Sequence, residues 1–342
     1  MSEQNLLTVD HLTVNFDTDQ GTVYAVRDIS FHLAPGEILG IVGESGSGKS
    51  VSMYAIMGLL AENGHILSGD ITFDGQNISP TSCSPKAYSR IMQDIRGRTL
   101  AMIFQDPMTF LNPVLSIEKQ LTEPLLNHTS LSHAAAREKA LELLRQVGIP
   151  DPEKRITQYP HEFSGGMRQR IIIAIALANN PKLIIADEPT TALDVTIQAQ
   201  ILELIRESTK KLGTATIMIT HDLGVVASMC DRINIMYGGK IVESGTDKEI
   251  FYDARHPYTR GLLGCINNPE EADHDLTPIP GSPPDLLKPP AGCPFVDRCS
   301  EAMRICKLRM PETETLSDTH TCACWRLEAE RRHIANGGET HA

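Results

Sequence analysis

The spacing of apolar residues predicts strands in the first part of the chain. Apolar and polar residues alternate over residues 6–42, as in Leu12–Phe16 and Ile29–Leu33, and this alternation is typical of half-buried strands. The continuous apolar run Ile38–Val42 predicts a fully buried strand, and residues 69–78 predict another strand at a sheet edge. We therefore expect short strands that lead into a buried one.

The pattern becomes helical from about residue 115 to residue 180, where Leu141, Leu144 and Val147 recur at helical spacing. A further helix is expected over about 195–211. Four apolar runs flank these helices and predict core strands: Ala101–Phe104, Leu183–Ala186, Ala215–Thr220 and Ile233–Tyr237. The alternation predicts an α/β fold with a helical insertion at about 106–180.

The composition changes after about residue 256. Six prolines crowd between 278 and 290, and five of the eight cysteines follow between Cys293 and Cys324. Proline-rich stretches are typical of extended connections. We therefore divide the 342-residue chain into a domain at 1–255, a small Cys-rich C-terminal module at 256–330, and a flexible polar tail at 331–342.

A glycine-rich loop follows the buried strand Ile38–Val42 and precedes a predicted helix. It has the Gly-x-x-x-x-Gly-Lys-Ser spacing of a phosphate-binding loop. Glycines let backbone N–H groups face phosphates, and the helix start adds partial positive charge. An ordinary glycine-rich turn would lack this strand and helix. The phosphate-binding candidates are Gly43, Ser45, Gly46, Ser47, Gly48, Lys49 and Ser50.

Two acids end a later apolar strand, at Asp187 and Glu188. Carboxylates are costly to bury unless they have a partner such as a metal ion. Beside a phosphate-binding loop, Asp187 would orient Mg²⁺ with Ser50, and Glu188 would orient or deprotonate the attacking water. The alternative is an acid pair that caps the next helix, and the complete loop disfavours it.

With these motifs the chain resembles the ATP-binding-cassette (ABC) ATPases over roughly residues 6–255. The resemblance implies a P-loop NTPase core with an antiparallel β subdomain and a helical subdomain. Ser164, Gly165 and Gly166 match the family signature, although Phe163 and Met167 replace the usual Leu and Gln around it. Ser-Gly-Gly alone is more often a helix cap.

Other family landmarks follow in order. The resemblance implies that Phe16 stacks on adenine, although a strand Phe is more often a core residue. It also implies that Gln105 senses Mg²⁺ or water, that Asp194 ends a segment facing the opposite subunit, and that His221 is a switch that hydrogen-bonds the γ-phosphate. ABC ATPases pair head to tail, so each phosphate-binding loop faces the Ser-Gly-Gly of its partner and two ATP molecules lie between them.

The segments Arg255–Leu263 and Ile279–Asp285 resemble the C-terminal extension of oligopeptide, dipeptide and nickel importer ATPases. This resemblance implies peptide import, with dipeptides favoured and nickel as the alternative cargo. The implied partners are a second, homologous ATPase subunit, two integral membrane permease subunits and an external peptide-binding protein. The implied location is peripheral, on the cytoplasmic face of the cell membrane.

Four cysteines, Cys293, Cys299, Cys306 and Cys324, match the cysteine pattern of the same extension. Four thiolates can hold zinc or an iron–sulfur cluster, and spacing alone does not choose between them. A set of buried, unbound cysteines is the further alternative. The resemblance implies a [4Fe-4S] cluster. We interpret Cys83, Cys230 and Cys265 as packing residues.

Charge and hydropathy exclude other classes of function. The formal net charge of −12 argues against nucleic-acid binding, which rests on neutralising phosphates. The longest apolar run, Ile171–Ala178, is too short to span a bilayer, and the N-terminus lacks the pattern of a signal peptide. A soluble ABC ATPase of translation or DNA repair is the alternative function. Single-cassette length and the short insertion at 106–180 disfavour it.

Overall fold

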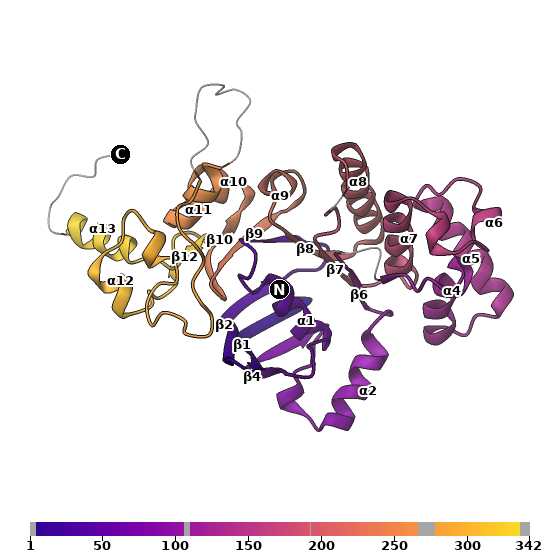
Figure 1. Ribbon diagram of the computed structural model, residues 1–342, viewed down its shortest axis with the longest axis horizontal. Coiled ribbons are helices and arrows are strands. Elements are labelled where there is room, and N and C mark those ends of the chain that lie inside the picture. The colour runs from indigo at the N-terminus through magenta and orange to yellow at the C-terminus, as the bar shows by residue number, and fades with distance from the viewer. Residues whose placement is uncertain (1–4, 106–109, 192, 266–277, 336–342) are drawn as a thin grey trace.

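The computed structural model describes residues 5–105, 110–191, 193–265 and 278–335, in two sheets with helices around them (Figure 1). The smaller sheet is antiparallel, in the order β2-β1-β4-β5. Its strands are β1 Leu7–Thr18, β2 Gly21–Leu33, β4 Gly64–Phe73 and β5 Gln76–Asn77. The short strands predicted here are in fact two long ones. Register shifts within the β1–β2 pair interrupt the alternation that the sequence shows.

The larger sheet has the order β11-β12-β10-β9-β3-β8-β7-β6 among the described residues. Strands β9, β3, β8, β7 and β6 run parallel, and β10 and β12 extend the sheet in antiparallel pairs. The strands are β3 Ile38–Val42, β6 Leu100–Ile103, β7 Leu183–Asp187, β8 Ala215–Thr220, β9 Arg232–Tyr237, β10 Lys240–Thr246, β11 Glu314–Thr315 and β12 Thr321–Cys322. The predicted core strands are thereby confirmed.

Helices cover both sheets. The predicted helical middle is confirmed for its described part, and it extends from the larger sheet at the magenta side of Figure 1, with α7 packed on β6. The sequence pattern did not predict α2, α9, α10, α11, α12 or α13. The helices are α1 Lys49–Met57, α2 Pro85–Ile95, α4 Ile117–His128, α5 His133–Gln146, α6 Pro152–Arg155, α7 Gly165–Leu177, α8 Val195–Leu212, α9 Leu223–Met229, α10 Asp247–Tyr252, α11 Pro257–Leu263, α12 Arg304–Leu308 and α13 Trp325–Ala335, with short 3₁₀ turns at Pro80–Ser82, Pro160–Glu162 and Val296–Arg298.

The larger sheet separates two hydrophobic cores. Successive side chains of a strand point to opposite faces. Leu183 and Ile185 of β7 therefore join the core with α1 and the antiparallel sheet. Ile184 and Ala186 join the core on the other face, which contains residues of α4, α5, α7 and α8. Strand β7 is buried on both faces, which is why it reads as a continuous apolar run.

Residues 278–335, here called the C-terminal segment, share the sheet and core of the rest of the chain. Strand β12 pairs with β10, and Cys293, Phe295 and Cys306 belong to the same core as β7. The prediction of a separately organised Cys-rich module is therefore wrong, because this segment buries its apolar residues against the larger sheet. The predicted tail at 331–342 begins inside α13, and its residues 336–342 lie outside the described chain.

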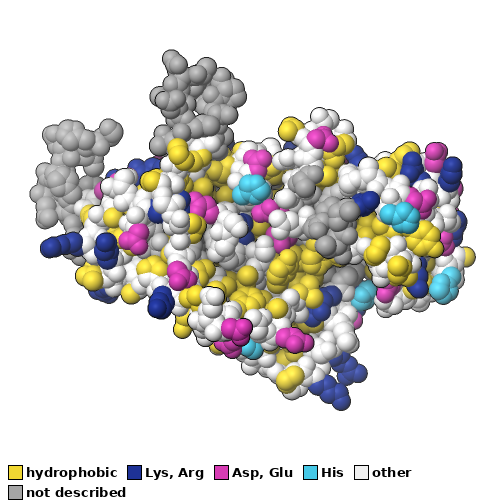
Figure 2. Space-filling view, in the orientation of Figure 1, with side chains coloured by type: hydrophobic (Ala, Val, Ile, Leu, Met, Phe, Trp, Pro, Cys, Tyr) yellow, Lys and Arg dark blue, Asp and Glu magenta, His cyan; other side chains and the backbone are white. Residues whose placement is uncertain are grey.

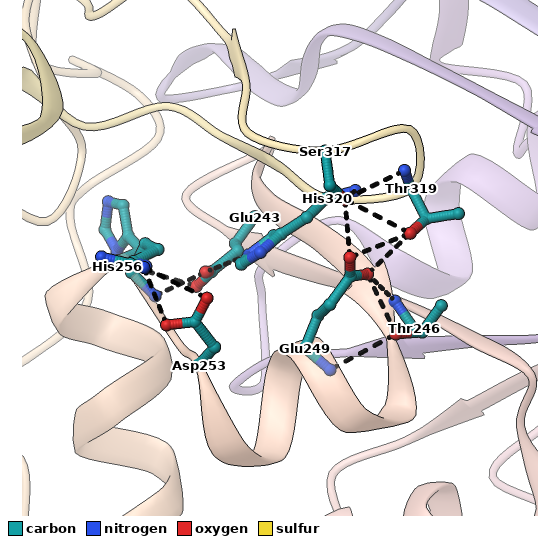
Figure 3. A network of polar contacts seen from close by, with 9 residues as sticks. Glu243, Thr246, Glu249, Asp253, His256, Ser317, Thr319 and His320 are labelled. Carbon is teal, nitrogen blue, oxygen red and sulfur yellow. Dashed lines mark hydrogen bonds and ion pairs between the residues drawn. The ribbon is translucent and has the colours of Figure 1, made fainter.

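Two carboxylates, the buried Glu243 and the partly exposed Glu249, hold the C-terminal segment in place (Figure 3). Glu243 of β10 accepts hydrogen bonds from the backbone N–H groups of Arg255 and His256, at 2.6 and 3.0 Å, and its Oε1 lies 2.9 Å from His320 Nε2. Glu249 of α10 accepts from the hydroxyls of Ser317 and Thr319. Although burial opposes the shift, hydrogen bonds such as that from Ser317 lower the pKa of Glu249 to about 2. Both acids thus bind the loop before β12.

Candidate active site

The predicted phosphate-binding and catalytic residues gather where four parallel strands end. The phosphate-binding loop, Gly43–Ser50, follows β3, and Asp187 ends β7. His221 follows β8, and Gln105 lies just beyond β6. Neighbouring parallel strands bring their carboxyl ends to one edge of the sheet, where ligands of open α/β folds bind. The order β3-β8-β7-β6 therefore joins residues that are far apart in the sequence.

The phosphate-binding loop wraps around the Lys49 ammonium group. Lys49 Nζ donates to the carbonyls of Gly43 and Glu44, at 2.7 and 3.0 Å. Burial lowers the pKa of Lys49, against the acids nearby that raise it. A Cβ at position 43 would lie 2.1 Å from the Met236 carbonyl oxygen, so only glycine fits there. Ser47 Oγ is buried and has no hydrogen-bond partner among the described residues, which suits a loop built for an oxygen-rich ligand.

Asp187 is buried and held by two hydroxyl groups. Ser50 Oγ donates to its Oδ1 at 2.8 Å, and Tyr54 OH donates to its Oδ2 at 3.2 Å. Burial raises the pKa of Asp187 above its usual value, although both hydrogen bonds oppose this. Tyr54 was not among the predicted site residues. The signal was available, because Ser50 and Tyr54 are four residues apart on α1 and so lie on one helix face.

Glu188 is held by three residues from different segments. Its Oε2 accepts from Gln105 Nε2 at 3.0 Å and from Thr191 Oγ1 at 2.8 Å, and its Oε1 lies 3.4 Å from His221 Nδ1. The Glu188 backbone has a φ of 45°, in the left-handed region. This conformation costs a non-glycine residue about 1–2 kcal/mol. Such strain is found where a side chain must be aimed at a functional site.

The signature residues lie at the start of α7. Ser164 caps this helix by accepting from the Met167 N–H. Gly166 allows close packing on α8, since a Cβ there would lie 2.8 Å from Ile197. Asp194 caps α8 by accepting from the Ile197 N–H at 3.0 Å. Among the described residues no hydrogen bond joins Ser164, Gly165 or Gly166 to the loop of the same chain.

Phe163 and Phe16 both lie in packed surroundings. Phe163, which replaces the usual Leu, is buried in the core, with the Arg155 guanidinium 5.7 Å from its ring centre. This apolar position explains why one large residue can replace another. Phe16 lies near the end of β1, opposite Gly64 of β4, and is partly buried against the core. Its stacking on adenine stays a prediction.

Four cysteines of the C-terminal segment line one cavity. The cysteine cavity is bounded by Cys293, Cys299, Cys306 and Cys324. Gly292 lets the backbone before Cys293 lie close to the backbone of Cys306, since a Cβ at position 292 would lie 2.0 Å from the Cys306 carbonyl oxygen. Burial raises the pKa of the thiols of Cys293, to about 12, and of Cys324, to about 11. Among the described residues, no group of three or more His, Cys, Asp or Glu side chains is arranged to hold a metal ion.

The other cysteines differ from one another. Cys230 is buried and packs close to Gly40, as expected of a packing residue, and Cys83 is half-buried. Cys265 is exposed, which contradicts its interpretation as a packing residue. Cys322 is fully buried in β12, opposite Glu243 of β10. No disulfide links the described cysteines.

Comparison with known proteins assigns the family. Residues 26–191 match the ABC transporter family, and residues 242–306 match the oligopeptide/dipeptide transporter C-terminal region. The oligopeptide transport ATP-binding protein OppD of Bacillus subtilis is 54% identical over 327 residues, which cover 95% of this chain and 90% of that protein. The chain belongs to the ABC transporter ATPases with an oligopeptide/dipeptide C-terminal region.

Two further ABC transporter proteins are similar to this chain over most of its length. The dipeptide transport ATP-binding protein DppD of Bacillus subtilis is 50% identical over 337 residues, covering 98% of this chain and 99% of that protein. Among solved structures, the dimeric post-hydrolysis ABC cassette MJ0796 with ADP and Pi is 26% identical, with a TM-score of 0.61. That match covers 73% of this chain and 99% of the other. No described helix of this ABC ATPase is long and apolar enough to cross a bilayer.

Proposed function

We propose that this ABC ATPase hydrolyses ATP to power the import of dipeptides or oligopeptides through a membrane transporter. One observation carries the proposal. Glu188, held by Gln105, Thr191 and His221, adjoins the Ser50–Asp187 pair of a complete phosphate-binding loop. The cargo class is supported by the C-terminal region and by relatives that are named for peptide transport.

The loop would bind the ATP phosphates through its backbone N–H groups and the Lys49 ammonium. Mg²⁺ would supply charge neutralisation at the phosphates. The oxygen ligands of Mg²⁺ would come from Ser50, Asp187 and Gln105. Ser50 Oγ and Asp187 Oδ1 already lie 2.8 Å apart. Glu188 would accept a proton from the attacking water, so that ATP and water yield ADP and phosphate. His221, whose side chain is 67% exposed, is free to turn toward the γ-phosphate.

ATP would join this chain to a second ATPase subunit. Ser164, Gly165 and Gly166 lie at the N-terminus of α7, where backbone N–H groups and the helix dipole favour an anion. Within one chain they make no hydrogen bond to the described phosphate-binding loop, so a partner's loop would supply the phosphate. The dimeric ABC cassette with ADP and Pi supports this arrangement. A homologous, non-identical partner is the pairing we propose.

ATP binding would be coupled to two membrane permease subunits, and a peptide-binding protein would lie on the outer side of the membrane. The ATPase would then sit peripherally on the cytoplasmic face of the membrane. We propose no nucleic-acid partner. The net charge is −12, and Lys and Arg side chains lie scattered among acidic ones on the face in Figure 2. A nucleic-acid backbone would favour a basic stripe.

The transport proposal predicts that cargo stimulates hydrolysis. The chain is assembled in vesicles with its partner ATPase and permease subunits, and phosphate release is measured with peptide-loaded or empty binding protein. We expect at least about fivefold faster release with the loaded protein, the lower end of typical coupling between sites. Equal rates would contradict peptide import, and stimulation by a nickel-loaded binding protein instead would identify nickel as the cargo.

We further propose that the cysteine cavity holds a [4Fe-4S] cluster, with zinc as the alternative. The support is that Cys293, Cys299, Cys306 and Cys324 line one cavity, and that four thiolates are the usual ligands of such a cluster. Bound iron would keep the thiols deprotonated despite their burial. The cavity lies in the C-terminal segment, so its role would be structural or redox-sensing and not hydrolytic.

Metal analysis of anaerobically purified protein tests the cluster. We expect about four iron and about four sulfide per chain, and a marked loss of both in Cys299→Ser. The exposed Cys265 provides a matched control, since Cys265→Ser should keep the full content. Stoichiometric zinc without sulfide would replace the cluster by a zinc site, and protein without either would leave four unbound thiols.

A further inference from the structure

Glu44, within the phosphate-binding loop, is held at three points. Its backbone N–H donates to Tyr258 OH at 2.9 Å. Its carbonyl accepts from Lys49 Nζ at 3.0 Å, and its carboxylate accepts from Arg298 Nη1 at 2.7 Å. Tyr258 belongs to α11 and Arg298 to the C-terminal segment. Two of the three restraints on this residue therefore come from outside the nucleotide-binding part of the chain.

Burial and hydrogen bonds fix the Arg298 side chain against the phosphate-binding loop. Its side chain is 7% exposed. Besides Glu44, it donates to Tyr237 OH at 3.0 Å and to the carbonyls of Ile279 and Pro280, at 3.1 and 2.9 Å. The hydrogen bond to Glu44 raises the pKa of Arg298, so the side chain stays charged. A buried guanidinium with its donors engaged holds its position, because each bond fixes the planar fork.

Residues that contact Glu44 or Arg298 also pack against the wall of the cysteine cavity. Phe295 lines that cavity and packs edge-on against Tyr237, with ring centres 5.2 Å apart. Its ring also lies 5.3 Å from that of Tyr258. Cys299, a cavity residue, directly follows Arg298. Tyr237, Tyr258 and Phe295 thus form a continuous aromatic layer between the cavity and the loop.

The charge of Glu44 explains why the loop needs this support. A carboxylate in a loop that binds phosphates repels them unless a cation neutralises it. Arg298 supplies that cation from a position 254 residues away in the sequence. Without Arg298, the Glu44 carboxylate would face the anionic ligand unpaired, and its side chain would lose its anchor.

We propose that Arg298 and Tyr258 are positioning residues for ATP binding, through which the C-terminal segment and α11 set the conformation and charge of the phosphate-binding loop. This proposal rests on the proposed function, because it requires ATP to bind at Lys49. It makes ATP affinity depend on residues that border the cysteine cavity. By reciprocity, bound ATP stabilises the packing around that cavity.

The affinity of the full-length chain for Mg·ATP, measured by calorimetry, tests the proposal. We expect Arg298→Met to raise Kd about tenfold, a typical coupling between sites. Adding Glu44→Gln should restore most of the affinity, since the unpaired carboxylate is then gone. Arg331→Met is the matched control: Arg331 pairs with Glu314 inside the C-terminal segment, and its loss should leave Kd unchanged.

Two outcomes would overturn the proposal: unchanged affinity in Arg298→Met, or a loss that Glu44→Gln does not rescue. Tyr258→Phe provides a second variant if Arg298→Met fails to fold. This variant keeps the aromatic layer and removes only the oxygen that accepts from the Glu44 N–H, so the Kd for Mg·ATP should rise severalfold. An unchanged Kd would exclude a positioning role for Tyr258. Failure of the wild-type chain to bind Mg·ATP would instead refute the proposed function.

Discussion

Replacing Glu188 by glutamine is expected to slow ATP hydrolysis by about 10²–10⁴-fold, the usual contribution of a general base. Glutamine keeps the size of the side chain and can still bond Thr191, but it cannot accept a proton from water. Phosphate release under saturating ATP measures the loss. Bound nucleotide, measured after gel filtration, should remain, because Lys49 and the loop are untouched.

A matched control separates this effect from a general loss of acidic charge. Glu203 lies on α8 and pairs with Arg206 at the surface, so Glu203→Gln should hydrolyse ATP at the wild-type rate. Unchanged turnover in Glu188→Gln would remove Glu188 from its assigned role. Loss of nucleotide binding together with turnover would make Glu188 a binding residue instead of a base.

Lys49→Ala is expected to weaken ATP binding on the order of 100-fold. Hydrogen bonds to charged groups contribute about 1.5–3 kcal/mol each, and the Lys49 ammonium is the cation that the loop itself encloses. The dissociation constant of Mg·ATP, measured by calorimetry, reports the change. Phosphate release should fall with it at low ATP concentration.

The control for this prediction is a lysine outside the site. Lys182 forms an exposed ion pair with Asp74, and such pairs contribute little. Lys182→Ala should therefore bind ATP as the wild type does. Wild-type affinity for Mg·ATP in Lys49→Ala would refute the phosphate-binding loop as the nucleotide site.

Much of the nucleotide site could be predicted because its parts are local patterns. The phosphate-binding loop is a continuous run between a strand and a helix, and Asp187 and Glu188 end a strand that reads as buried. Their roles follow from the chemistry of glycines, a lysine and carboxylates at these places. Tyr54 was also accessible, since its spacing from Ser50 follows the helix period.

Other parts depend on contacts that no local pattern contains. Arg298 and Tyr258 contact Glu44 across 254 and 214 residues in the sequence. Arg298 lies in the proline- and cysteine-rich stretch, and Tyr258 lies in the segment Arg255–Leu263, and neither pattern indicates a contact with the loop. The same stretch misled the domain prediction. Its composition does not say which surface its apolar residues cover. Strand β12 pairs with β10, which joins the stretch to the main sheet.

The class of protein, the phosphate-binding loop, the acidic strand end and the set of four cysteines could all be identified from short motifs, because the chemistry of each motif depends on neighbouring residues. The contacts of Glu188 with Gln105 and His221, the meeting of the four cysteines at one cavity and the pairing of Arg298 with Glu44 became visible only in the folded chain. Strand order and buried packing set these distances. They arise from the whole fold, and no stretch of residues encodes them alone.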